Sequence, residues 1–441
     1  MKRFVTIHGH FYQPPRENPW LEYVEVQDSA APYHDWNQRI TQECYLPNAN
    51  ARILDQEGFI SEMINNYARI SFNFGPTLLS WLQENAPQVY HSILEADGES
   101  QKRFGGHGSA IAQAYNHIIM PLADDRDKLT QVRWGIKDFV HRFNRFPEGM
   151  WLPETAVDLA TLEALAQEGI AFTVLAPHQA KAVRLIGTKE WRLVDQSSLD
   201  IHLPYRINLP SGKSLTIFFY HQGIARGVAF ENLLRDGATF ARTLVEALDS
   251  RTTPQIISVA TDGESFGHHH PFGDMALAFA LTFIERHLDA QVTNFGEFLE
   301  RFPPQWEVQI AENTSWSCSH GIERWRSDCG CQTGGNPGWH QRWRQPLRNT
   351  LDWLKEEIDQ IFITATQLFL TNPWAARDDY LGVLLNPTPS ARDQFLKRHT
   401  SRPLSPYEKV RIWKALEMER HRILMFTSCG WFFSDIAGIE T

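Results

Sequence analysis

The stretch Ile256-Ile257-Ser258-Val259-Ala260-Thr261-Asp262-Gly263-Glu264-Ser265-Phe266-Gly267-His268-His269-His270 decides the fold. Its apolar, β-branched beginning is typical of a buried strand, and the acid and polar cluster that follow are typical of a functional strand end. The same arrangement occurs upstream, where Met150-Trp151-Leu152-Pro153 leads to Glu154. A barrel brings acids at the ends of distant strands to one edge. We therefore expect Glu154 and Asp262 to meet at the mouth of an α/β barrel.

Strand-like and helix-like segments alternate over the first 300 residues. Strands are expected at 3–8, 69–74, 170–175, 215–220 and 256–261, and helices at 53–66, 77–84, 124–143, 158–168, 240–248 and 275–287. Residues 16–50, rich in Pro, Asn, Asp and Trp, are expected to form a long functional loop. The alternation predicts a parallel-stranded barrel with its site at the carboxyl ends of the strands.

After about residue 300 the pattern becomes helical. Apolar residues recur every three or four positions within 346–370, and 407–426 reads as a second long helix. We therefore expect a catalytic barrel over residues 1–300 and a helical domain over residues 301–441. The second domain is expected to contribute a loop rich in Trp and Cys to the active site.

Composition excludes several classes of function. The net charge of −10 argues against a nucleic-acid partner and favours a neutral substrate. No apolar run is long enough to span a membrane, and the apolar stretch after Lys2-Arg3 is too short for a signal peptide. The 5 cysteines, an odd number, argue against a secreted disulfide scaffold. A cytoplasmic protein is expected, and no feature indicates its oligomeric state.

Two facing carboxyl groups are what cleavage of a glycosidic bond requires. A retaining enzyme holds them ~5–5.5 Å apart, and an inverting enzyme ~6.5–9.5 Å apart. In the alternative interpretation, Glu154 and Asp262 are helix N-caps or paired surface charges. Of the 15 tryptophans, 6 cluster between Trp306 and Trp353; such side chains suit the apolar faces of sugar rings but would equally fill an aromatic core.

Two clusters of possible metal ligands accompany the acids. The histidines His8, His10, His117 and His268-His269-His270 could bind zinc, as in a hydrolase or deacetylase, could bond sugar hydroxyls, or could be structural. Cys318-Ser319-His320 with Cys329-Gly330-Cys331 could form a tetrahedral zinc site, although the spacing departs from the common zinc patterns. The alternative is a loop of reduced thiols near the pocket.

Together these segments resemble glycoside hydrolase family 57, the group of α-amylases, 4-α-glucanotransferases and branching enzymes. The resemblance is carried by His8-Gly9-His10 with Gln13-Pro14, by 108–122 with His117, by Trp151-Leu152-Pro153-Glu154, by 261–268 and by 315–321. The last of these blocks has the Cys-rich form of a less characterised branch. Better-known members often have a Glu at the position occupied here by Ser109-Ala110-Ile111 and Gln113. The substrate specificity of those members is therefore not assumed for this chain.

The resemblance implies an incomplete (β/α)7 barrel followed by a C-terminal α-helical domain. It also implies a retaining mechanism on α-1,4-linked glucans or malto-oligosaccharides, by hydrolysis or by transfer, without a metal or other cofactor in catalysis. Glu154 would be the nucleophile and Asp262 the acid/base. The expected substrate-binding residues are His8, His10, Gln13, His117, Trp151, Glu264, His268, His269, Trp316 and Trp325, of which His10, His117, Trp151 and His268 would line the −1 subsite.

Two other functions stay open at this point. A zinc-dependent polysaccharide deacetylase or α-mannosidase on a related seven-stranded barrel would use Asp262 and two or three histidines as metal ligands. A catalytically inactive glucan-binding protein would keep the fold and the aromatic side chains but would not depend on Glu154 for its function.

Overall fold

The computed structural model describes residues 2–334, 337–439 and 441. Its chain divides into two compact units, each built from separate stretches of sequence. Unit 1 comprises Met1–Gln113, Pro147–Trp151 and Gly169–Glu312, and unit 2 comprises Ala114–Phe146, Leu152–Glu168 and Asn313–Thr441. The predicted domain boundary at residue 300, and the contribution of a loop from the second domain to the active site, stay predictions.

In the described part of unit 1, the wall of a barrel is formed by seven strands that run parallel to one another. They are β1 (Arg3–Phe11), β4 (Ser71–Phe74), β5 (Ala112–Gln113), β6 (Met150–Trp151), β7 (Phe172–Leu175), β11 (Ser214–Phe219) and β12 (Gln255–Asp262). Parallel strands buried on both faces are expected to be almost continuously apolar. β1 and β12 are buried along their length except at one terminal residue each, but polar residues such as Thr6, His8 and Ser258 interrupt their apolar sequences.

The order of the strands follows from their pairing. β1 pairs with β12 on one side and with β4 on the other, β5 pairs with β6, and β7 pairs with β11. Single bridges from Phe72 to Ala110 and from Gly149 to Phe172 connect these pairs. The ring closes where the amide of His221, just after β11, donates to the carbonyl of Ser258 in β12 at 2.7 Å. The short β5 and β6 leave part of the wall irregular, as expected for an incomplete (β/α)7 barrel.

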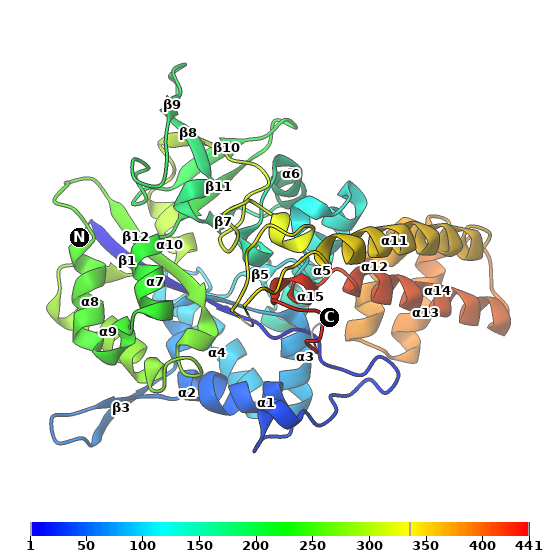
Figure 1. The fold of residues 1–441 in the computed structure, drawn as a ribbon, viewed down its shortest axis with the longest axis horizontal. Coiled ribbons are helices and arrows are strands. Elements are labelled where there is room, and N and C mark those ends of the chain that lie inside the picture. Colours follow the sequence, from blue (N-terminus) through cyan, green and yellow to red (C-terminus); the bar gives the residue numbers. More distant parts are fainter. Residues whose placement is uncertain (1, 335–336, 440) are drawn as a thin grey trace. The chain divides into compact units, whose positions relative to one another are not determined.

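Helices cover the barrel of unit 1. They are α1 (Trp36–Ile40), a π-helical segment (Thr41–Tyr45), α2 (Leu46–Ala49), α3 (Pro76–Asn85), α4 (Pro87–Arg103), α7 (Gln222–Phe230), α8 (Gly237–Glu246), α9 (Gly273–His287) and α10 (Phe295–Arg301). α8 and α9 pack side by side (Figure 1). The side chain of Asp236 caps α8 by accepting from the amide of Thr239. The helices predicted at 77–84, 240–248 and 275–287 are confirmed.

The sheet extends beyond β11 through further strands of unit 1. β10 (Tyr205–Asn208) is antiparallel to β11 and is followed in the sheet by β14 (Trp306–Ile310), β8 (Ala180–Leu185) and β9 (Arg192–Leu193). β13 (Gln291–Val292) pairs with the beginning of β1.

The helix predicted at 53–66 is wrong. This segment forms a hairpin of β2 (Ala51–Leu54) and β3 (Ile60–Ile64). The turn between them is set by Asp55, whose Oδ1 accepts from the amides of Glu57 and Phe59, and by Gly58, whose φ of 86° favours glycine. Ile53 and Ile64 pack against α9. Their spacing, which fits a helix, therefore belongs to the buried face of a two-stranded hairpin.

The long loop predicted at 16–50 is confirmed only in its first part. Residues 36–49 form α1, the π-helical segment and α2. The side chain of Asp35 accepts from the amide of Gln38 and so begins α1 as an N-cap. These helices were not predicted because the many polar and aromatic residues in this stretch are more typical of a loop.

Unit 2 is predominantly helical. It contains α5 (Asp125–Phe143), α6 (Leu159–Gln167), α11 (Arg344–Thr366), α12 (Pro373–Leu385), α13 (Pro389–His399), α14 (Pro406–Leu424) and α15 (Cys429–Phe432). α11 packs against α14, and α12 packs against α5 and α13 (Figure 1). The predicted helices at 124–143, 158–168, 346–370 and 407–426 are confirmed. No helix in the described part of the chain has both the length and the apolar character needed to cross a membrane.

A buried ionic network connects four helices of unit 2. Asp127 of α5 accepts from Arg377 of α12 at 3.0 Å and from Arg422 of α14 at 2.5 Å. Arg377 also donates to Glu419, and Arg422 donates to Asp359 of α11 at 2.7 Å. Arg422 and Glu419 are completely inaccessible to solvent. These charges are tolerated in the interior because each has a partner.

Replacing Arg422 by Met is expected to destabilise unit 2. The substitution leaves Asp127 and Asp359 with fewer positive partners, and breaking a buried pair in this way costs about 3–5 kcal/mol. Arg398→Met is the matched control, because Arg398 is 61% exposed in its pair with Asp379 and such pairs contribute about 0–1 kcal/mol. Thermal unfolding followed by circular dichroism measures both effects. Equal melting temperatures for the two variants would contradict the assigned importance of the network.

Candidate active site

Two imidazoles and an indole stack at the carboxyl end of the barrel in unit 1. The ring of Trp151, from β6, lies 4.8 Å from the ring of His8 and 5.2 Å from the ring of His10, measured between centroids. Both histidines belong to β1, and their interplanar angles to the indole are 21° and 23°. His8 and Trp151 are fully buried, and His10 is nearly so.

Polar side chains of neighbouring strands orient the two imidazoles. His8 Nε2 lies 3.1 Å from Asn73 Oδ1, and His8 Nδ1 lies 3.0 Å from Ser71 Oγ. His10 Nδ1 lies 3.0 Å from Asn73 Nδ2, which also donates to Gln113 Oε1 at 2.8 Å. Burial lowers the pKa of both His8 and His10 to about 3. The two rings are therefore neutral near pH 7 and are suited to hydrogen bonds with uncharged groups.

Asp262 is the last residue of β12 and lies level with His10 in the sheet, because the two are paired in the parallel register. Unlike its neighbours in the strand, Asp262 is exposed. Tyr220 lies near this carboxylate. Burial, and secondly the charge of Asp262, raises the pKa of the Tyr220 phenol above its usual value.

Glu264 is a second acid close to the strand end, and it is buried. Its Oε1 accepts from the hydroxyl of Tyr45 at 2.6 Å and from the amide of Tyr12 at 3.0 Å. Gln13 also bonds this carboxyl group. Burial outweighs these bonds and raises the pKa of Glu264 to about 7. The contacts attach the segment after β12 to the segment after β1.

His268 and His269 follow in the same loop of unit 1. His268 Nδ1 bonds Glu43 Oε2, and the edge of Trp36 faces its ring with centroids 6.0 Å apart. The amide of His269 donates to the carbonyl of Glu264 at 3.0 Å, and the imidazole of His269 is exposed.

Glu154 lies in unit 2 in an unusual backbone conformation. Its φ is 58°, and the next residue, Thr155, has a φ of 49°. Left-handed conformations are costly for β-branched residues such as Thr, and such strain is concentrated at functional sites. The conformation presents the Glu154 side chain to the 315–331 loop of the same unit.

Two donors from this loop converge on one oxygen of Glu154. Trp316 Nε1 donates to Glu154 Oε2 at 2.9 Å, and Ser317 Oγ donates to the same atom. Burial raises the pKa of Glu154, while these two bonds and the positive charge of Arg324 oppose the shift. Arg324 also holds the loop, because its Nη1 donates to the carbonyl of Ser317 at 2.9 Å.

Two other predicted residues of unit 2, His117 and Trp325, bond residues of the C-terminal segment. His117 has a φ of 55°, and its Nδ1 lies 2.7 Å from Ser428 Oγ. Trp325 is fully buried, and its carbonyl accepts from Arg348 Nε at 3.2 Å. A role in substrate binding stays a prediction for both residues, as it does for the other residues named from the sequence.

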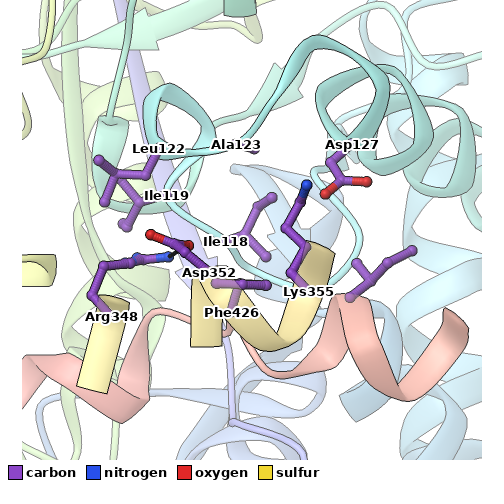
Figure 2. Close-up of a pocket in the computed structure, with 10 residues that line it drawn as sticks. Ile118, Ile119, Leu122, Ala123, Asp127, Arg348, Asp352, Lys355 and Phe426 are labelled. Atoms are coloured by element: carbon purple, nitrogen blue, oxygen red, sulfur yellow. Dashed lines mark ion pairs between the residues drawn. The ribbon is translucent and has the colours of Figure 1, made fainter. Parts of the chain in front are cut away.

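A pocket in unit 2 contains none of the predicted site residues (Figure 2). Its walls come from the segment before α5 on one side and from α11 and α14 on the other. The lining residues are Ile118, Ile119, Leu122, Ala123, Asp127, Arg348, Asp352, Lys355, Ile423 and Phe426.

The structure thus groups the predicted residues within each unit. Unit 1 joins His8, His10 and Trp151 to the strand end that carries Asp262, and it joins Gln13 to Glu264. Unit 2 joins Glu154 to Trp316. Sequence reasoning missed Asn73, Tyr45 and Ser317. Asn73 carried one signal, since it is a polar residue between Phe72 and Phe74 in an apolar strand.

Comparison with known proteins identifies the family. Residues 4–311, well over half of the chain, match the sequence profile described as glycosyl hydrolase family 57. The chain belongs to glycosyl hydrolase family 57. The resemblance inferred from the sequence blocks is therefore confirmed. Residues 339–441 match a second profile, described as a domain of unknown function (DUF3536).

Several solved structures share the fold. An exo-type maltose-forming amylase from Pyrococcus sp. ST04 superposes with a TM-score of 0.70 at 16% identity, covering 99% of this chain and 76% of that chain. A family 57 branching enzyme from Pyrococcus horikoshii gives a TM-score of 0.58 at 16% identity, with 96% and 88% covered. At these identities the likeness shows the fold alone, and it confirms the α/β region followed by a helical region.

A curated protein matches over a shorter stretch of the chain. Alpha-amylase 1 of Dictyoglomus thermophilum is 26% identical over 106 residues, which is 24% of this chain. The match spans only 15% of that relative's length.

Glu264→Gln is expected to change how stability depends on pH. The folded-state pKa of Glu264 is raised to about 7, so its contribution is fully present below about pH 4.5 and is lost as the pH rises through 7. The wild type should therefore lose about 2 kcal/mol relative to Glu264→Gln between pH 5 and pH 7.5. Urea unfolding at pH 5 and pH 7.5 measures the difference.

Glu57→Gln, in the exposed turn between β2 and β3, is the matched control and should follow the wild type at both pH values. A stability difference between Glu264→Gln and the wild type that is the same at both pH values would count against a raised pKa at Glu264.

Proposed function

We propose that the chain is a retaining α-glucan hydrolase or transglycosylase in which Glu154 is the nucleophile and Asp262 is the acid/base. The observation that supports this most directly is the environment of Glu154. Its backbone is held in a left-handed conformation, and two donors bond a single carboxylate oxygen. Trp316 and Ser317 both donate to Oε2 of Glu154 and not to its Oε1. We therefore assign Oε1 as the atom that attacks the substrate.

The reaction has two steps. Glu154 Oε1 attacks the anomeric carbon while Asp262 transfers its proton to the departing glycosidic oxygen, which leaves a β-glycosyl ester on Glu154. Asp262, now a carboxylate, then takes a proton from water or from a sugar hydroxyl. The activated oxygen displaces Glu154 from the anomeric carbon. Water as acceptor gives hydrolysis, and a sugar hydroxyl gives transfer.

The surroundings of each acid fit its role. A nucleophile must be ionised; burial raises the pKa of Glu154, and the bonds from Ser317 and Trp316 and the charge of Arg324 limit that rise. Because one oxygen accepts both bonds, the orientation of the carboxylate is also restricted. Asp262 is exposed beside the neutral ring of His10, so it can exchange protons with solvent between the two steps.

The names of the structural relatives support the substrate class. A maltose-forming amylase, a 4-alpha-glucanotransferase and a branching enzyme all act on α-linked glucose chains. We assign α-1,4-linked glucans or malto-oligosaccharides to this chain on that basis. The neutral His8 and His10 suit the uncharged hydroxyls of such a substrate.

The zinc-dependent alternative requires Asp262 and barrel histidines to direct their ligand atoms at one point. Within the described residues of unit 1, no three acids or histidines bring their ligand atoms close enough to hold one metal ion. The four residues of the described chain that do so are Cys318, His320, Cys329 and Cys331 in the Cys-rich loop of unit 2. His8 and His10 are instead bonded to Ser71 and Asn73. This geometry favours the glycosidase mechanism.

Glu154→Ala is expected to lower turnover of maltoheptaose and amylose by several orders of magnitude, because covalent catalysis is lost. Azide should restore part of the rate on an activated maltosyl substrate and should yield a β-glycosyl azide, detectable by NMR. Glu357→Ala, at an exposed acid on α11, is the control and should keep wild-type activity. Near-normal turnover by Glu154→Ala, or rescue that gives the α-azide, would rule out Glu154 as the nucleophile.

Asp262→Asn is expected to affect substrates according to their leaving groups. Protonation matters least when the leaving group is already a weak base, so α-maltosyl fluoride should still be consumed while maltoheptaose turnover falls steeply. The ratio of kcat/KM for the two substrates measures this. If both substrates slow by the same factor, Asp262 is not the proton donor.

A further inference from the structure

The Cys-rich loop of unit 2 brings four possible metal ligands together. Cys318, His320, Cys329 and Cys331 each offer one ligand atom, and these atoms all lie within 4.8 Å of one another. Cys318 Sγ is 3.9 Å from Cys329 Sγ and 3.7 Å from Cys331 Sγ, and Cys331 Sγ is 3.5 Å from His320 Nδ1. The cluster is not a disulfide, because all three cysteines are free.

The two sulfur–sulfur distances and the one sulfur–nitrogen distance given above match edges of a zinc coordination tetrahedron. Zinc binds thiolate sulfur at ~2.3 Å and imidazole nitrogen at ~2.0–2.1 Å, so tetrahedral geometry places sulfur atoms ~3.8 Å apart and sulfur ~3.5 Å from nitrogen. A disulfide would require ~2.05 Å between sulfurs. Soft thiolate and imidazole ligands in a tetrahedron select zinc among the common divalent metals.

We propose that Cys318, His320, Cys329 and Cys331 bind one zinc ion in a closed structural site. Four protein ligands leave no position for water or substrate, which distinguishes a structural site from a catalytic one. The site goes beyond the proposed glycosidase mechanism, in which no metal takes part.

Two glycines allow the short spacing between the ligands. Gly330, between Cys329 and Cys331, has a φ of 82°, which turns the chain so that both thiols face the same point. Gly321, directly after His320, has a φ of 86°, and a Cβ there would lie 2.3 Å from the carbonyl oxygen of Asn313. The spacing that departs from common zinc patterns is therefore sterically feasible.

The charge around the cluster also fits a bound zinc ion. Three thiolates, one imidazole and Zn²⁺ carry a net charge of −1. Arg344 is fully buried, and its Nη1 donates to the carbonyl of Cys331 at 2.9 Å. Among the described residues, the bonds of this guanidinium go to carbonyl oxygens and not to a carboxylate. A buried guanidinium needs a negative partner, and the zinc–thiolate centre supplies it.

The zinc ion would fix the loop that positions the donors of Glu154. Trp316 and Ser317 directly precede Cys318, and both donate to Glu154 Oε2. The cysteines are thus positioning residues, and this consequence rests on the proposed role of Glu154. The presence of the metal does not depend on that role.

Metal analysis of the full chain, purified without chelator, tests the site. We expect one zinc ion per chain in the wild type and loss of that zinc in Cys329→Ser and Cys331→Ser. Cys331→His is the conservative variant and should retain zinc, because imidazole is also a zinc ligand. Cys429→Ser, outside the cluster, is the matched control and should retain one zinc ion.

A titration of the wild-type chain with Co²⁺ tests the site without any variant, so its result does not depend on whether the variants fold. Wild-type chain treated with chelator should take up one Co²⁺ and develop a thiolate-to-cobalt charge-transfer band. Wild-type chain that holds no zinc and gives no such band would overturn the proposal, as would a disulfide among these cysteines in the intact mass. If zinc is found but its removal leaves kcat on maltoheptaose unchanged, the site stands and its link to Glu154 fails.

Discussion

The parallel pairing of β1 with β12 is the constraint on which the candidate site depends. It runs without a break from Arg3 opposite Gln255 to His10 opposite Asp262. Because side chains alternate along a strand, a shift by one residue would turn every side chain to the other face. Burial of both strands on both faces makes such a shift costly. The level position of His10 and Asp262 follows from this register.

Burial of polar groups sets the protonation states in unit 1. Moving a polar group out of water is costly unless it is hydrogen bonded, and a charged group costs more. His8 and His10 respond by remaining neutral with Asn73 as a shared partner. Glu264 responds by holding its proton up to about pH 7. Burial thus lowers the pKa of the two histidines and raises the pKa of the glutamate, because it disfavours the charged form of each.

Much of the fold could be predicted from the sequence, because long periodic segments and apolar runs carry strong signals. β12 and α5 are examples. The β2–β3 hairpin could not, since Ile53, Ile60 and Ile64 fit both helical and alternating spacing, and only the Asp55–Gly58 turn decides between them.

Part of the candidate site could be proposed from the sequence, and the roles of its residues stay predictions. Trp151, Glu154 and Asp262 lie in recognisable motifs. Asn73, Tyr45 and Ser317 are ordinary residue types whose importance arises from contacts across the fold. The Cys-rich loop was visible as a set of candidate ligands. Its short spacings became interpretable only with the left-handed conformation of Gly330.

The discontinuous build of unit 2 limits how the chain can be cut. α5 and α6 are encoded within the stretch that supplies the barrel strands, yet they belong with the C-terminal helices. A fragment ending near residue 312 would retain Asp127 without Arg377 and Arg422, and Trp134 without Leu381 and Ile423. Such a fragment would expose an apolar face and an unpaired acid. Shortened versions for crystallisation or for domain exchange should therefore keep the C-terminal helices.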